Sequence, residues 1–239
     1  MFLHYKSQQN ATPLFTIVSF FIGLFILTSC LDDESPSPEY AYLSLYHASP
    51  DTDAVDILIG DSQVNSQPFS FKDYSERYIS VLPGSKSLEF INEDNETSIL
   101  DTTFSFEKNK YYSVFIADSL NSIETIVFGD SVNLESLDEG EAMIRFIHMS
   151  PDSPDVEVLA NDDELFASIS FKNGTPFEPF NVESDFSLTF KATTGEESIL
   201  LTDPNVELQA GRLYTIILTG FLNAPEGNSN EISYDIIKN

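Results

Sequence analysis

Apolar and polar residues alternate in short segments along most of the chain. In residues 42–47, every second position is Leu43, Leu45 or His47, and residues 55–59 and 112–116 show the same period of two. This period is typical of β-strands with one buried face. No segment after residue 39 shows a convincing helical period. The pattern therefore predicts an all-β chain.

Turn-forming residues separate these segments at intervals of roughly ten residues. The turn strings are SPD at 49–51, PGS at 83–85, NEDN at 92–95, EKNK at 107–110, TTGEE at 193–197 and QAGR at 209–212. About seven short strands in each half of such a chain favour antiparallel β-sandwiches of immunoglobulin-like size. The pattern indicates no particular strand order.

The chain contains an internal tandem repeat. Five strings recur in the same order at a nearly constant offset, which chance would hardly produce. The first copies are HASPD at 47–51, VDIL at 55–58, SFK at 70–72, SLEF at 87–90 and KYYSVFI at 110–116, and the second copies lie at 148–152, 156–159, 170–172, 187–190 and 212–218. We expect a first β-sandwich repeat at 40–130, an acidic linker at 131–140 and a second repeat at 141–239.

An apolar run precedes the repeats. Residues 14–27 are almost wholly apolar and follow Lys6, as in a secretory signal peptide, here at residues 1–29. A permanent transmembrane anchor is the alternative, but the run is shorter than the roughly 20 residues of a spanning helix. The string LTSC at 27–30 resembles the lipobox of bacterial lipoproteins. Because Cys30 is the only cysteine, we expect it to be lipidated and to anchor the chain in a membrane.

Residues 30–39 combine this cysteine with an acidic Ser/Pro stretch, LDDESPSP at 31–38. Such a stretch forms an extended tether. The acidic run resembles the export signal that carries lipoproteins of Bacteroidetes-like bacteria to the outside of the outer membrane. The resemblance implies a lipid-anchored outer-membrane protein displayed on the cell surface, and a merely solvated tether is the alternative.

The charge of the chain excludes one class of partner. There are 39 acidic and 11 basic residues, a formal net charge of −28. Nucleic-acid binding depends on Lys and Arg that neutralise phosphates, so this function is excluded. Because 41% of the residues are hydrophobic, the chain can still bury a core, and the acidity belongs to its surface.

The opening string of each repeat resembles a known family signature. YHASPDTDAVDILIGD at 46–61 and IHMSPDSPDVEVLAND at 147–162 are similar to the start of the bacterial family called domain of unknown function 4397. Members are exported and often carry the module in tandem. The resemblance covers both repeats and implies the fold family. It implies no activity, because none is established for the family.

Each repeat places one histidine at the inner end of its first strand. His47 and His148 fall on the apolar face, directly before the turn. There a ring nitrogen can bond the turn backbone while the ring packs against the core. We interpret the residues of both corners as structural: His47, Ser49, Pro50, Asp51, His148, Ser150, Pro151 and Asp152.

Metal binding at the corners is an alternative interpretation. Zinc normally takes three or four His, Cys or carboxylate ligands, and each repeat offers one histidine and no thiol. Calcium is chemically easier, because Asp51, Asp53 and Asp56 supply oxygen ligands, although the second repeat lacks this spacing. We expect no metal and no cofactor, and retain the three aspartates as calcium candidates.

The chain lacks the common catalytic motifs: a Gly-x-Ser-x-Gly elbow, a cysteine nucleophile, His-Glu-x-x-His and a glycine-rich phosphate loop. We predict a non-enzymatic cell-envelope lipoprotein that displays its modules for adhesion or for protein or surface interaction. One alternative is a glycan-binding surface lipoprotein, with Tyr42, Tyr46 and Tyr74 as candidate exposed aromatics. A calcium-dependent binding module is another. The sequence does not identify the protein or glycan partner.

Overall fold

The computed structural model describes residues 39–132, 137–182, 186–194 and 198–239. The predicted signal peptide at 1–29, the predicted lipidation site Cys30 and the predicted tether up to residue 38 lie outside the described residues. In the described part, the elements are strands and one short 3-10 helix, which confirms the predicted all-β class. None of the described segments is a helix with the length and apolarity needed to cross a membrane.

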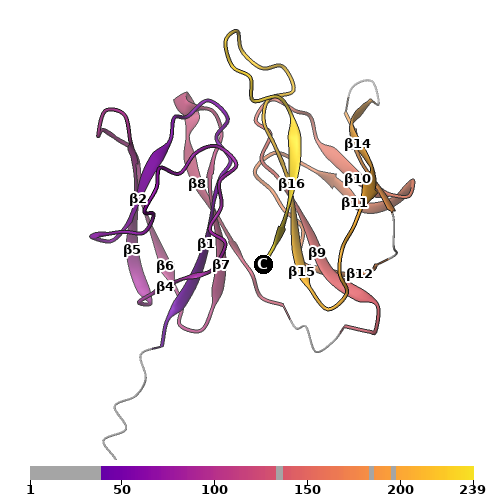
Figure 1. Cartoon of the computed structure of the whole chain (residues 1–239), viewed down its shortest axis with the longest axis horizontal. Coiled ribbons are helices and arrows are strands. Elements are labelled where there is room, and N and C mark those ends of the chain that lie inside the picture. The colour runs from indigo at the N-terminus through magenta and orange to yellow at the C-terminus, as the bar shows by residue number, and fades with distance from the viewer. Residues whose placement is uncertain (1–38, 133–136, 183–185, 195–197) are drawn as a thin grey trace, which may run out of the picture. The chain divides into compact units, whose positions relative to one another are not determined.

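The first module consists of two four-stranded sheets (indigo to magenta in Figure 1). The strand orders are β4-β1-β7-β8 and β3-β2-β5-β6. The strands are β1 (Ala41–His47), β2 (Val55–Ile59), β3 (Ser62–Gln63), β4 (Ile79–Val81), β5 (Gly84–Asn92), β6 (Ser98–Phe106), β7 (Tyr111–Ala117) and β8 (Glu124–Gly129). The 3-10 helix η1 (Leu120–Ser122) lies between the last two strands.

The second module repeats this arrangement strand for strand. Its sheets have the orders β12-β9-β15-β16 and β11-β10-β13-β14. The strands are β9 (Glu141–His148), β10 (Val156–Ala160), β11 (Asp163–Ile169), β12 (Glu178–Asn181), β13 (Phe186–Ala192), β14 (Ile199–Val206), β15 (Leu213–Thr219) and β16 (Ser233–Lys238). The expectation of two β-sandwiches is therefore confirmed.

The alternation seen in the sequence places side chains in the core of each sandwich. Leu43 and Leu45 of β1 are buried with Val55 and Ile57 of β2, between the two sheets of the first module. The second module buries the equivalent positions of β9 and β10 in a core of its own. Burial of these apolar side chains is the main stabilising contribution to each sandwich.

One strand pair in each module departs from the expected antiparallel pairing. β1 runs parallel to β7, and β9 runs parallel to β15. The other pairs of named strands are antiparallel. The sequence could not reveal this, because a strand alternates with the same period whichever way its neighbour runs.

Candidate functional site: the face shared by the two modules

One sheet of each module packs its outer face against the other module. Buried apolar side chains from β1, β7, β9, β15 and β16 and from the corners after β1 and β9 meet there in a third cluster, separate from the two sandwich cores. They are Tyr46, Ala48, Phe115, Ala117, Ile147, Met149, Ile217 and Ile237. Both modules accordingly belong to one compact unit, Glu39–Asn239. The two repeats share a hydrophobic interface and are not independent domains on a string.

Tyr46 lies in this interface, and the expectation that it is exposed was wrong. Its exposed fraction is 3%, and its hydroxyl donates a hydrogen bond of 2.7 Å to Asp235 Oδ2. Burial, reinforced by that carboxylate, raises the pKa of Tyr46 far above its ordinary value, so the phenol remains a donor. The alternation assigned Tyr46 to the outer face of its sheet, but the second module covers that face.

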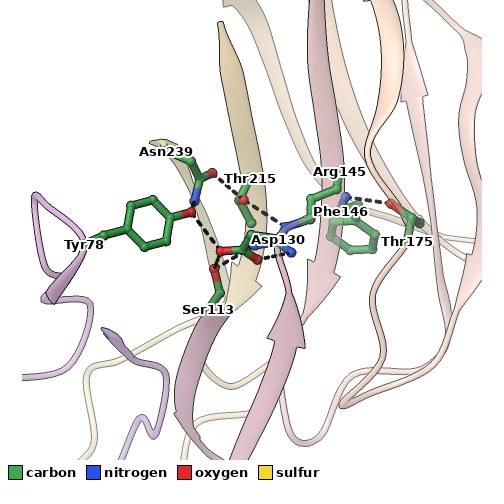
Figure 2. A network of polar contacts seen from close by, with 8 residues as sticks. All are labelled: Tyr78, Ser113, Asp130, Arg145, Phe146, Thr175, Thr215 and Asn239. Atoms are coloured by element: carbon green, nitrogen blue, oxygen red, sulfur yellow. Dashed lines mark hydrogen bonds and ion pairs between the residues drawn. The ribbon is translucent and has the colours of Figure 1, made fainter. Parts of the chain in front are cut away.

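A buried ion pair crosses the same interface (Figure 2). Arg145 comes from β9 of the second module, and Asp130 directly follows β8 of the first. Arg145 Nη1 lies 2.8 Å from Asp130 Oδ1, and the two side chains are 2% and 0% exposed. An unpaired buried charge is strongly destabilising, so each group requires the other.

Neighbouring polar groups make further hydrogen bonds to both members of the pair. Arg145 Nη2 donates to Ser113 Oγ at 2.7 Å, and Nε donates to Thr215 Oγ1 at 3.0 Å. Asp130 Oδ2 accepts from the Tyr78 hydroxyl and from Ser113 Oγ, both at 2.8 Å. Side chains of both modules contribute to this network, which makes its geometry specific to one relative position of the two sheets.

The surroundings of the guanidinium set its electrostatics. Burial lowers the pKa of Arg145 from its ordinary value, and the adjacent Asp130 opposes this shift. Burial, together with Asp130, also raises the pKa of Tyr78, which keeps its hydroxyl protonated. The ring of Phe177 lies 4.3 Å from the guanidinium carbon and adds a cation–π contact.

Two lysines from the repeated SFK strings bridge the modules in matching ways. Lys72 Nζ lies 3.1 Å from Asp235 Oδ2 on β16. Lys172 Nζ lies 2.5 Å from Asp118 Oδ2 and also pairs with Glu124 on β8. Because β8 and β16 are equivalent strands, each module directs its lysine to the last strand of the other. This is the reciprocal pattern of a two-fold interface.

The buried ion pair breaks this two-fold pattern. Strand registers align Arg145 with Ser44, and Asp130 with Asn239. Asn239 Oδ1 accepts a hydrogen bond of 2.7 Å from Thr215 Oγ1, so the equivalent of the carboxylate is a neutral amide. At these equivalent positions, one half of the interface carries a charged pair and the other carries neutral side chains. Identical modules could not produce this difference, so the contact is specific to these two copies.

The corner histidines lie inside their modules, fully buried. His148 Nε2 lies 3.0 Å from the Pro154 carbonyl, and Nδ1 accepts from the Ser150 N–H at 3.3 Å, which places the ring proton on Nε2. His47 Nε2 makes a longer contact of 3.4 Å to the Asp53 carbonyl. Burial lowers the pKa of His47 to about 4 and that of His148 in the same direction. Both rings are neutral at pH 7.

The aspartate of each corner binds the loop that follows the seventh strand of its module. Asp51 Oδ1 accepts from the Leu120 N–H at 2.7 Å. The two oxygens of Asp152 accept from the N–H groups of Leu222 and Asn223 at 2.6 and 2.7 Å. These carboxylates therefore connect each corner to a second loop of the same module.

The corner serines also make internal bonds, each in a different way. Ser150 Oγ donates to the Gly220 carbonyl at 2.6 Å. Ser49 Oγ bonds the hydroxyl of Thr52. The two copies thus use the same residue type with different partners.

The first corner additionally contacts the second module. The Pro50 carbonyl accepts from Asn228 Nδ2 at 2.9 Å and from Asn230 Nδ2 at 2.6 Å. Both asparagines lie in the loop between β15 and β16. Pro151 occupies the same turn position in the second corner. The repeated string is therefore part of the inter-module contact in its first copy.

The three calcium candidates point to separate partners. Asp51 bonds the loop after β7, as described above, and Asp53 Oδ2 accepts from Asn92 Nδ2 at 3.1 Å. Asp56 Oδ1 accepts from Gln63 Nε2 at 2.9 Å. Over the part of the chain that the structure describes, no three His, Cys, Asp or Glu side chains are arranged to hold a metal ion.

A comparison of the whole sequence with models of protein families agrees with the resemblance of the repeated corner strings. The family model described as "Domain of unknown function (DUF4397)" matches residues 41–158 and again 142–229. The chain belongs to the DUF4397 family. The two matched segments extend over both sandwiches, which confirms the tandem DUF4397 modules predicted from the repeated strings.

Other known proteins add little to the DUF4397 assignment. No curated protein matches the chain. A family 26 carbohydrate-binding module from Eubacterium rectale, solved with maltoheptaose, is 12% identical with a TM-score of 0.27, over 83% of this chain and 97% of that one. A protein provisionally assigned to cell adhesion from Bacteroides eggerthii is 9% identical with a TM-score of 0.21, over 84% and 95%. Such low TM-scores carry no argument about function.

The first DUF4397 module carries a cluster of tyrosines near the ion pair. Tyr42 stacks on Tyr111 with ring centroids 4.6 Å apart, and Tyr78 meets Tyr111 edge-on at 5.0 Å. Tyr111 is 45% exposed and borders a cleft of about 320 Å³ with Asn109, Lys110 and Ser131. Tyr74, which is not part of this cluster, has an exposed fraction of 44%. Sequence reasoning named Tyr42 and Tyr74 but missed Tyr111, the first residue of β7, which precedes the alternating positions 112–116.

Proposed function

We propose that this protein is a non-enzymatic lipoprotein of the cell envelope whose two modules together bind a protein partner, in adhesion or surface interaction. The observation that carries the proposal is the buried Arg145–Asp130 pair inside the shared apolar face. A buried ion pair that is held by side chains of both modules favours one relative position of the modules, so their loops and sheet edges keep a constant spacing. Such preorganisation reduces the entropy lost on binding.

A lipid anchor is the second element of the proposal. Cys30 in the lipobox-like string carries the acyl chains, and residues 31–38 hold the modules away from the outer membrane, on the cell surface. The net charge of −28 supports this arrangement, because an acidic body is repelled by anionic headgroups and stays available to a partner.

The corner histidines support binding over catalysis. His47 and His148 are fully buried and contact backbone carbonyls. A general acid or base must reach the substrate proton within hydrogen-bond distance. The buried positions of these two rings therefore suit a structural role in an interaction module.

Crosslinking on intact cells tests the proposed function. A photo-crosslinking residue placed at exposed Tyr74 or exposed Leu82 in the native chain is expected to capture a defined protein, identified by mass spectrometry. An unrelated lipidated β-sandwich of similar charge is the control. Capture of the same abundant neighbours by both proteins would contradict a specific partner.

The tyrosine cleft favours glycan binding as a second candidate function. Tyr111 offers an exposed aromatic ring beside the polar side chains of Asn109 and Ser131, and sugars stack on aromatic rings while their hydroxyls bond polar groups. Retention on immobilised cell-surface polysaccharide is the test. Tyr111→Ala should abolish retention, and Tyr74→Ala, which removes an equally exposed ring, should not. Equal retention of the Tyr111 variant would exclude this site.

A further inference from the structure

The two modules differ at one sheet edge. β3 and β11 are equivalent edge strands of their sheets. β3 has only two residues, whereas β11 has seven. An edge strand presents backbone N–H and C=O groups that a further strand can bind. The second module therefore offers a long edge where the first does not.

Side-chain hydrogen bonds and a proline prevent a further strand from pairing with this edge of the first module. After β3, the Asn65 side chain replaces strand pairing: Oδ1 accepts from the Ile57 N–H at 2.8 Å, and Nδ2 donates to the Val55 carbonyl at 3.0 Å. Pro68 follows and has no N–H to offer. Pairing resumes only at an isolated bridge between Phe69 and Val55. The first edge cannot accept a continuous additional strand.

The second module keeps this edge continuous. β11 pairs with β10 from Asp163 to Ile169, with register shifts but without a break in the strand. Its first two residues, Asp163 and Glu164, are exposed. The strand thus combines an accessible backbone with two acidic side chains at its beginning.

A cleft of about 320 Å³ opens beside β11. Glu164 and Leu165 of β11, Pro179 and Phe180 of β12, and Phe186 of β13 contribute to its lining. This volume is at the lower end for ligand pockets and suits one or two apolar side chains. Pro179 has no N–H to donate from the edge of β12. Of the two edge strands beside the cleft, β11 is therefore the one able to pair with an incoming strand.

We propose that β11 docks an extended segment of a partner protein in which Lys or Arg residues alternate with apolar residues. The segment adds to the sheet as a further strand, places apolar side chains in the cleft on one face and brings its cations, on the opposite face, close to the acidic start of β11. A second copy of this chain is a poor occupant, because its charge of −28 repels an equally acidic surface. The inference rests on the proposed protein-binding function and assigns its site.

Binding of defined peptides to the full-length protein tests this site. The probes are fluorescent eight-residue peptides of alternating valine and lysine, the same peptide N-methylated at alternate backbone nitrogens, and an alternating valine and glutamate peptide. Fluorescence anisotropy should show saturable binding of the first probe, and at least tenfold weaker binding of the other two. The double variant Asp163→Lys/Glu164→Lys should lose at least tenfold in affinity for the valine and lysine peptide.

A matched variant in the first module provides the control. Asp61→Lys changes an exposed acidic residue in the equivalent cleft, between β2 and β4, and should leave the affinity within twofold. Equal losses in both variants, or equal binding of the N-methylated peptide, would overturn the proposal. Crosslinking on intact cells distinguishes a failure of the β11 site from a failure of the proposed protein-binding function. A specific partner retained by Asp163→Lys/Glu164→Lys leaves the function intact and refutes the β11 site, whereas no specific partner of the unmodified protein refutes both.

Discussion

Arg145 and Asp130 lie 2.8 Å apart in a buried contact that joins the first strand of one module to the residue after the last strand of the other. The pair sits in the same interface as the apolar cluster of Tyr46, Phe115 and Ile217. The ion pair forms only when the two faces are correctly aligned. Apolar side chains alone can also pack when one face is displaced along the other. Stability and alignment of the modules are thereby coupled.

Removal of one partner of the pair should destabilise the protein strongly. Arg145→Ala leaves Asp130 as a buried, unpaired charge, and the free energy of unfolding should fall by about 3–5 kcal/mol. Urea denaturation followed by circular dichroism measures this change. Arg77→Ala, which removes an exposed arginine, should stay within about 0.5 kcal/mol. The double variant Arg145→Met/Asp130→Leu should recover much of the loss, since it removes both charges.

Stability should fall as the pH is lowered from about 6.5 to 4, in part because of His47. Its pKa is about 4 in the folded protein and about 6.5 when unfolded. Between these values only the unfolded state binds the proton, so stability is fully present above 6.5 and decreases toward pH 4. The contribution is about 3 kcal/mol. Denaturant unfolding at pH 7 and pH 4.5 should show a smaller difference for His47→Gln than for the unmodified protein.

The aspartates of the two corners should protect different loops. Asp152→Ala removes the acceptor of the Leu222 and Asn223 N–H groups, and amide hydrogen exchange at these residues should accelerate. The loss of global stability should be modest, roughly 1 kcal/mol, because the bonds are solvent-exposed. Asp51→Ala should instead accelerate exchange at Leu120. Faster exchange at Leu120 in the Asp152 variant would contradict this assignment.

Cys30 should determine where the protein resides. Cys30→Ala removes the thiol that would carry acyl chains, so the chain should shift from the membrane fraction to the soluble fraction. Cell fractionation and metabolic labelling with a palmitate analogue measure both effects. Cys30→Ser is a second variant that keeps the size of the side chain. Unchanged membrane association of both variants would contradict a lipid anchor at this residue.

The sequence predicted the strand class and the repeat because both depend on local pattern. The alternation at Leu43, Leu45 and His47 reports which face of a strand is apolar, and this face is indeed buried. The same alternation says nothing about what covers the opposite face. Tyr46 was therefore assigned to solvent, although the second module buries it.

The sequence did not predict the ion pair, because the pair joins two segments whose contact no local pattern indicates. One signal did exist. Strand β9 is apolar on both sides, with Met143 and Ile147 on one face and Ile144 and Phe146 on the other. This pattern is typical of a strand that is covered on both faces. A single arginine in such a strand indicates a buried carboxylate partner. The identity of that partner, Asp130, required the three-dimensional arrangement.

Cleavage between the modules tests the account most directly. A specific protease site introduced between residues 133 and 136 is cut in the folded full-length protein, and the product is analysed by size-exclusion chromatography at physiological salt. The buried interface predicts that both fragments elute together at the position of the uncut protein, and that they separate when Arg145→Ala is present. Separation of the fragments from the otherwise unmodified protein would contradict a fixed pair of modules.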